Sequence, residues 1–145
     1  MKFSEEIFTD FDFLSDEQKT AFIRALIHLA KSDGNFDDEE MEYITVLADM
    51  HGIAHSEIVR FKEEDTEDAV LESLQVMDNR RIALELIKEL CLLAHTDDQL
   101  SDEEMVFIGK CGLAMNIELE KIEQISNWVI DRIVWLEQAK IIFED

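Results

Sequence analysis

The chain has 145 residues, of which 35 are acidic and 13 are basic, and its net charge is −22 at pH 7. A chain with this charge repels the phosphate backbone of nucleic acids, so nucleic acid is excluded as an expected partner, and cations and basic protein segments are favoured. The alternative is that the acidity serves only solubility. Hydrophobic residues make up 47% of the chain, which predicts one folded domain over residues 1–145.

The sequence carries no signal for export or membrane insertion. The first residues lack the apolar core of a signal peptide, and no apolar run approaches the roughly 18 residues of a membrane span. Cys91 and Cys111 lie within apolar helical patterns and form no Cys-x-x-Cys motif, so we expect two reduced, buried thiols. These features predict a cytoplasmic protein without direct membrane insertion.

Helical patterns follow one another along the whole chain. In residues 1–14 large apolar residues alternate with acids, and we expect this segment to pack onto the body. The first clear helix follows Ser15, where Ser15-x-x-Gln18 has the spacing of a capping box. Apolar residues then recur at i, i+3, i+4 and i+7, as on a helix with one buried face. This helix ends near Ser32, and further helices are predicted over residues 38–51, 56–61, 66–77, 82–94, 102–115 and 118–143.

Two of these predictions concern helix starts and the centre of the bundle. We expect Ser56 to cap the short third helix, and Asp78 or Asn79 to cap the helix over residues 82–94. That helix is apolar on nearly every side, which marks it as the central helix of the bundle.

The tail over residues 118–143 is predicted to form one long helix, or two helices joined end to end, with two apolar stripes. The main stripe comprises Leu119, Ile122, Ile125, Val129, Ile133 and Leu136, and the second comprises Trp128, Trp135 and Ile142. We expect both stripes to pack on the body. The alternative is that the tryptophan stripe is a docking face, because large aromatic side chains are enriched at interface hot spots.

An acidic turn joins the first two helices and recurs later in the chain. Gly34 can adopt a positive φ and so end the first helix, and Asp37 and Glu40 have the Asp-x-x-Glu spacing of a capping box. The turn recurs 64 residues later with three equivalent pairs of residues: Asp33 and Asp97, Asp37 and Ser101, Glu40 and Glu104. We therefore predict an all-α bundle of about seven to eight helices, built from two pseudo-repeats over about residues 16–61 and 80–125.

The motif Asp33-Gly34-x-Phe36-x-x-x-Glu40, followed by a helix that ends near Gly52, resembles the TerB-like family of tellurite-resistance domains. This family is also similar to the amino-terminal part of some membrane-bound DnaJ-type co-chaperones. The resemblance covers about residues 22–125. It implies an all-helical domain with two related halves, acidic turns as candidate sites for divalent cations, a stress-response or defence context, and no established catalysis. In the second turn Asp98 replaces the expected glycine, which puts an equivalent second ion site in doubt.

The acidic turns contain the candidate metal ligands. A hard cation such as Ca²⁺ or Mg²⁺ needs several oxygen ligands, and the candidates are Asp33, Asp37, Glu40, Asp97 and Glu104. The first turn is not an EF-hand, because Asp38 stands where that loop needs glycine and Ile44 where it needs glutamate. The alternative is that Asp37, Glu40, Ser101 and Glu104 only cap helices. That alternative leaves Asp33 and Asp97 unexplained, since an acid at a helix carboxyl end meets the unfavourable end of the helix dipole.

The sequence contains no recognisable nucleophile motif and no glycine-rich phosphate loop, so no enzyme is predicted. The leading hypothesis is a non-enzymatic, acidic TerB-like module in a stress or tellurite response. It would dock a protein partner, basic or membrane-associated, and hold a divalent cation at its turns. The alternative is a cation-binding sensor whose occupancy controls docking. The oligomeric state is left open.

Overall fold

The computed structural model describes residues 13–32, 38–95 and 101–144. These ranges contain seven α-helices, one short 3₁₀ helix and no strand, so the predicted all-α fold class is confirmed. The helices are α2 (Asp16–Lys31), α3 (Asp38–Met50), α4 (His55–Glu64), α5 (Glu67–Ser73), η2 (Leu74–Val76, 3₁₀), α6 (Arg80–Ala94), α7 (Asp102–Ala114) and α8 (Leu119–Ile142).

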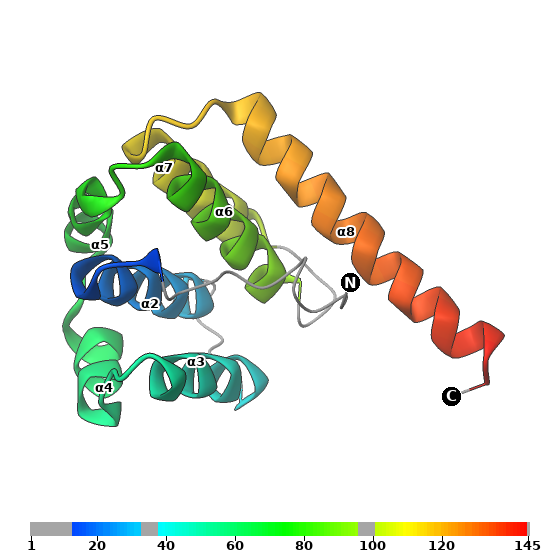
Figure 1. Ribbon diagram of the computed structural model, residues 1–145, viewed down its shortest axis with the longest axis horizontal. Coiled ribbons are helices and arrows are strands. Elements are labelled where there is room, and N and C mark those ends of the chain that lie inside the picture. Colours follow the sequence, from blue (N-terminus) through cyan, green and yellow to red (C-terminus); the bar gives the residue numbers. More distant parts are fainter. Residues whose placement is uncertain (1–12, 33–37, 96–100, 145) are drawn as a thin grey trace.

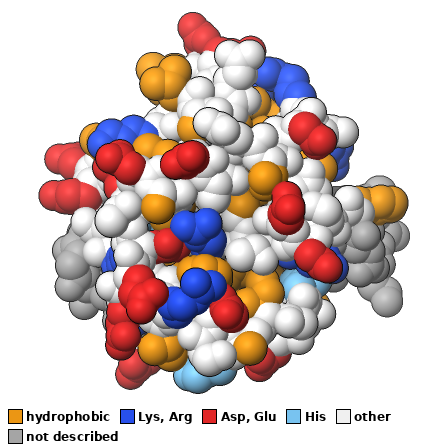
Figure 2. Space-filling view, turned by 90° about the vertical axis from the view of Figure 1, so that its left-hand side faces the viewer, with side chains coloured by type: hydrophobic (Ala, Val, Ile, Leu, Met, Phe, Trp, Pro, Cys, Tyr) orange, Lys and Arg blue, Asp and Glu red, His pale blue; other side chains and the backbone are white. Residues whose placement is uncertain are grey.

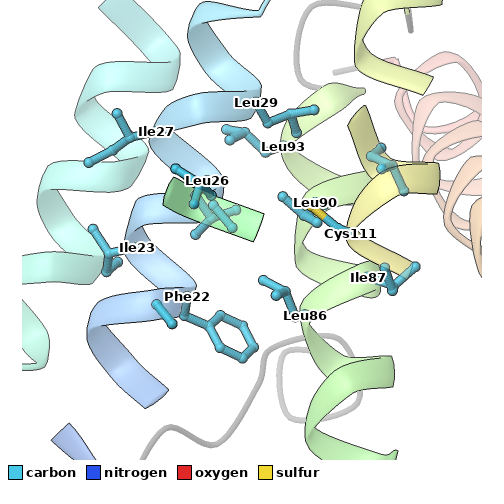
Figure 3. Close-up of a cluster of buried hydrophobic side chains, with 14 of the residues drawn as sticks. Phe22, Ile23, Leu26, Ile27, Leu29, Leu86, Ile87, Leu90, Leu93 and Cys111 are labelled. Carbon is cyan, nitrogen blue, oxygen red and sulfur yellow. The ribbon is translucent and has the colours of Figure 1, made fainter. Parts of the chain in front are cut away.

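The core is shared between α2 and α6. Helix α2 packs against α3, α4, α5, α6 and α7, and α6 packs against α2, α7 and α8. Leu26 and Leu29 of α2 lie close to Leu90 and Leu93 of α6, with Cys111 of α7 beside Leu90 (Figure 3), and all five side chains are fully buried. The helix predicted at the centre of the bundle is therefore one of two central helices, because the α3, α4 and α5 side of the molecule packs on α2.

Both predicted capping boxes that lie within the described residues are present. The Gln18 N–H donates to Ser15 Oγ at 3.1 Å, and the Ser15 N–H donates to Gln18 Oε1 at 2.9 Å. Ser101 and Glu104 make the same reciprocal pair at the start of α7, with both distances 3.1 Å. Each box satisfies two N–H groups that the first turn of a helix leaves without a partner.

Of the two other predicted helix caps, one is confirmed and one was wrong. Asn79 caps α6, because its Oδ1 accepts from the Arg81 N–H at 2.8 Å. Ser56 does not cap α4, which begins one residue earlier, at His55. The N-cap of α4 is Ala54, whose side chain makes no capping hydrogen bond.

The helices recur with a constant spacing. Three pairs of helices begin 64 residues apart: α2 and α6 at Asp16 and Arg80, α3 and α7 at Asp38 and Asp102, α4 and α8 at His55 and Leu119. The turns after α3 and α7 also agree, since Gly52 and Asn116 have φ values of 75° and 61°. Glycine and asparagine are the residue types that most readily adopt this left-handed conformation. These agreements are what a duplication would produce, and the duplication itself stays a prediction.

Helix α8 starts beside α6 and continues past its end (Figure 1). At the starts of the two helices, Arg80 Nη2 lies 2.6 Å from Glu118 Oε1. The helices then run in the same direction, and α6 ends at Ala94 whereas α8 continues to Ile142. The buried side chains of α8 are Ile122, Ser126 and Val129, which all belong to its first half. The second half of α8 therefore projects from the body.

Candidate functional site

The predicted cation ligands are only partly described. Asp33, Asp37 and Asp97 lie outside the described residues, whereas Glu40 and Glu104 stand in the first turns of α3 and α7. The side chains of Glu40 and Glu104 are only 3% and 2% exposed. Over residues 13–32, 38–95 and 101–144, no group of three or more His, Cys, Asp or Glu side chains is placed to hold a metal ion. The cation sites thus stay predictions that include undescribed residues.

For Glu104 the structure gives a structural role. Its Oε1 accepts the Ser101 N–H, and its own N–H donates to Ser101 Oγ. This is the helix-cap alternative that the sequence left open. A carboxylate at this position is also favoured by the positive end of the helix dipole.

A hollow of about 460 Å³ lies between the end of α2 and the starts of α5 and α7. Its lining side chains are His28, Ser32, Glu67, Asp102, Glu103, Val106 and Phe107. The His28 ring packs against the Phe107 ring with a centroid distance of 4.8 Å, and His28 Nδ1 is buried and has no hydrogen-bond partner among the described residues. Burial, followed by nearby Lys31, lowers the pKa of His28. His28 therefore shares this hollow with three acids, Glu67, Asp102 and Glu103, which sequence spacing alone did not connect with it.

A second hollow, of about 340 Å³, runs between α6 and α8 and is called here the α6–α8 groove. Each helix contributes four side chains at i, i+3, i+4 and i+7: Arg81, Leu84, Glu85 and Lys88 from α6, and Lys121, Gln124, Ile125 and Trp128 from α8. Sequence reasoning singled out Trp128 but missed the groove. Its two walls lie 40 residues apart, and the signal that could have found it is the repeated spacing of basic and apolar residues in both segments.

Two of the three basic residues of the groove form ion pairs with one acid on the α6 wall. Glu85 Oε1 lies 2.8 Å from Arg81 Nη2, and Glu85 Oε2 lies 2.6 Å from Lys88 Nζ. On the α8 wall, Lys121 Nζ donates to Gln124 Oε1 at 3.0 Å. The groove therefore combines an apolar lining with a basic rim.

The tryptophan stripe of α8 is exposed. Trp128, Trp135 and Ile142 are 46%, 49% and 69% exposed, so the expectation that this stripe packs on the body was wrong. The main stripe packs on the body where α6 and α7 are near. Its two end residues, Leu119 and Leu136, are exposed. The physical reason is that the outer half of α8 has no helix beside it among the described residues.

The opposite side of the molecule has a different character. On the face at the left of Figure 1, around α2, α4 and α5, acidic side chains surround a few basic ones (Figure 2). Two basic side chains of α2 are engaged: Arg24 binds Asp65 through two hydrogen bonds of 2.7 and 2.8 Å, and Lys31 Nζ donates to the Lys62 carbonyl at 2.9 Å. This face offers carboxylates to a partner, whereas the α6–α8 groove offers cations.

Comparisons with known proteins give one match. The model of the family described as tellurite resistance protein TerB matches residues 1–63, a span that includes α2, the first acidic turn and α3. No curated protein and no solved structure matches the chain. Among the described residues, no helix is both long enough and apolar enough to cross a membrane.

Proposed function

The chain is TerB-like, with the family match in residues 1–63, and on this premise we propose that it is a non-enzymatic module that docks a protein partner through the outer half of α8. The observation that supports this proposal is the exposure of large apolar side chains on a projecting helix. Trp135 is 49% exposed and Ile142 is 69% exposed. Several large apolar side chains exposed on one helix are typical of an interaction site, and tryptophan is enriched at interface hot spots.

The length of α8 supports the same proposal. Its counterpart by the 64-residue spacing is α4, which has 10 residues, whereas α8 has 24. The extra part is residues 129–142, and these begin just after the groove ends at Trp128. Within the extension Val129 still belongs to the core, whereas the large apolar side chains from Val134 to Ile142 are exposed.

The charge of the extension also favours a protein partner. Residues 129–142 contain two acids and two bases, Asp131, Glu137, Arg132 and Lys140, in a chain whose net charge is −22. A locally neutral, apolar segment can approach another protein with little of the repulsion that the acidic faces generate. Basic segments of the same partner would lie against the acidic faces, and nucleic acid would be repelled.

The cellular setting is part of the proposal. The family match by its printed description supports a tellurite or stress response. Cys91 and Cys111 are free and buried, which agrees with a reducing compartment such as the cytoplasm.

Site-specific crosslinking tests the docking proposal. A photoreactive amino acid is placed at position 135 of the full chain and, as a control, at position 63 on α4, in the cells that normally make the protein. We expect an adduct with one protein from position 135 and none with that protein from position 63. The partner is then purified and titrated calorimetrically into the full chain.

In that titration, Trp135→Ser should weaken binding about tenfold or more, as is typical of a hot-spot tryptophan. Leu113→Ser is the matched control, because Leu113 is an apolar side chain on α7 that is 81% exposed. Equal losses for both variants, or identical adducts from both crosslinking positions, would contradict the proposal.

The second candidate function is a divalent-cation sensor. It is favoured by the burial of Glu40 at the start of α3, directly after the first acidic turn in the sequence. Calorimetric titration with Ca²⁺ or Mg²⁺ should then give heat that is lost in Asp33→Asn and Glu40→Gln. Ionic strength must be matched with K⁺, because any salt relieves repulsion in so acidic a chain. No heat beyond the K⁺ control would rule the sensor out.

A further inference from the structure

The α6–α8 groove has the opposite charge balance from the rest of the chain. Three basic side chains line it, Arg81, Lys88 and Lys121, against one acid, Glu85. In the whole chain 35 acids outnumber 13 bases. The groove is therefore a local basic site on an acidic protein.

The shape of the groove fits a third helix. Its walls are two turns of α6 and two turns of α8, and the four lining positions of one helix match those of the other at an offset of 40 residues. Two neighbouring helices with side chains at i, i+3, i+4 and i+7 form the groove into which the ridge of another helix packs. Leu84, Ile125 and Trp128 supply the apolar contacts that such a helix needs.

The basic side chains differ in how freely they can reach an occupant. Lys88 is only 8% exposed, and its Nζ lies 2.6 Å from Glu85 Oε2 and 3.7 Å from Glu89 Oε1. In contrast, the side chain of Arg81 is 81% exposed although it also pairs with Glu85 Oε1 at 2.8 Å, and Lys121 stands on the opposite rim. Arg81 and Lys121 are therefore the groups that can close over a bound segment from both sides.

We propose that the α6–α8 groove binds an amphipathic helix of a partner protein that places its apolar side on Ile125 and Trp128 and its carboxylates toward Arg81 and Lys121. The inference rests on the proposed docking function and names the chemistry of the partner. A basic helix would meet like charges on both rims, whereas carboxylates form charge-assisted hydrogen bonds with guanidinium and ammonium groups. The net charge of the chain does not prevent this, because at physiological ionic strength charges beyond about 8 Å are largely screened.

Two designed peptides test the inference on the full chain. The first is a helical peptide with leucines at i, i+3, i+4 and i+7 flanked by glutamates, with alanines elsewhere, and the second carries lysine in place of each glutamate. Binding is measured calorimetrically at physiological ionic strength. We expect the glutamate peptide to bind about tenfold more tightly than the lysine peptide, since like-charge contacts across an interface are strongly unfavourable.

Charge reversal locates the binding site. Arg81→Glu combined with Lys121→Glu should weaken binding of the glutamate peptide about tenfold or more. Arg60→Glu combined with Lys62→Glu changes the net charge equally on α4 and should leave the affinity nearly unchanged. Circular dichroism checks that each variant is folded, and the exposure of Arg81 makes its replacement compatible with the fold.

The outcomes separate this inference from the docking proposal. Trp135 lies beyond the groove, so Trp135→Ser should leave peptide binding intact. If this variant loses binding to the natural partner, that result tests only the docking role of the outer half of α8. Equal binding of both peptides, or unchanged binding after the groove reversal, would overturn the inference while the docking proposal stands. A dimer in sedimentation that Lys121→Glu dissolves would also overturn it, because the occupant would then be a second copy of the chain.

Discussion

The packing of α7 against α8 depends on Gly112, because glycine has no side chain. A Cβ added at Gly112 would lie 2.2 Å from Ile122 Cδ1 and 3.2 Å from Ile122 Cγ1. Both residues are buried, and Ile122 is only 3% exposed. Gly112→Ala should gain up to about 1 kcal/mol of helix propensity but lose about 1–3 kcal/mol through overpacking. We expect a net loss of about 1 kcal/mol in the free energy of unfolding.

A second substitution should rescue the first. Ile122→Val removes the Cδ1 methyl that the new Cβ would overlap, and by itself it should cost about 0.5–1.5 kcal/mol. In the double variant one methyl has moved from Ile122 to Gly112, so the total volume is kept. We therefore expect the double variant within about 1 kcal/mol of the natural chain, whereas independent effects would sum to a loss of about 2 kcal/mol.

Urea unfolding followed by far-ultraviolet circular dichroism measures this cycle, provided that the transition is two-state. Thermal melts give a second readout, in which 1 kcal/mol corresponds to roughly 2–4 °C for a chain of this size. Additive losses in the double variant would refute the reasoning. So would a stabilised Gly112→Ala variant, because Ile122 would then have room to turn away.

Three further predictions concern other contacts. Ser101→Ala should lower the free energy of unfolding by about 0.5–2 kcal/mol in urea titrations because it removes a helix cap, and an equal effect of Ser56→Ala, which caps nothing, would contradict this. Tyr43→Phe should cost about 1–3 kcal/mol, because the Tyr43 hydroxyl donates to Glu89 Oε2 at 2.7 Å and Glu89 is 1% exposed; unchanged stability would refute it. The pKa of His28 is lowered in the fold, so the unfolded chain takes up a proton first as pH falls below about 6.5, and stability is lost in that direction. The loss of stability between pH 7 and pH 5 should therefore be smaller in His28→Gln than in the natural chain. Equal losses in the two proteins would contradict the assignment.

Local signals made most of the helices predictable. A capping box acts within four residues, so the starts of α2 and α7 could be located from Ser15 and Ser101 alone. Asn79 was one of two candidate caps for α6 and is the one observed. The motif Asp33-Gly34-x-Phe36-x-x-x-Glu40 led to the TerB-like assignment, which the family match over residues 1–63 supports.

The region after α4 shows how neighbouring groups override a helical pattern. Residues 66–77 were predicted as one helix, but α5 ends at Ser73 and η2 continues from Leu74 to Val76. The Ser73 hydroxyl donates to the Val70 carbonyl at 2.6 Å. Serine side chains compete for backbone groups in this way, and a final 3₁₀ turn is a common result.

The exposure of the α8 stripes and the α6–α8 groove could not be predicted from the sequence, because both depend on how the helices pack together. The stripes on α8 have helical spacing along their whole length, so spacing alone gives no sign of where the neighbouring helices stop. The α6–α8 groove likewise depends on two segments far apart in sequence that lie in register. For the cation ligands, Glu104 is accounted for as a cap, and Asp33, Asp37 and Asp97 lie outside the described residues.

The position of the tryptophans has a consequence for spectroscopy. The chain has two tryptophans, Trp128 and Trp135, and both are half-exposed on α8. Intrinsic emission from this protein therefore reports the surroundings of a single helix and says little about the interior around α2 and α6. A blue shift of that emission on adding a protein or peptide would signal that water has left this helix, without any attached dye.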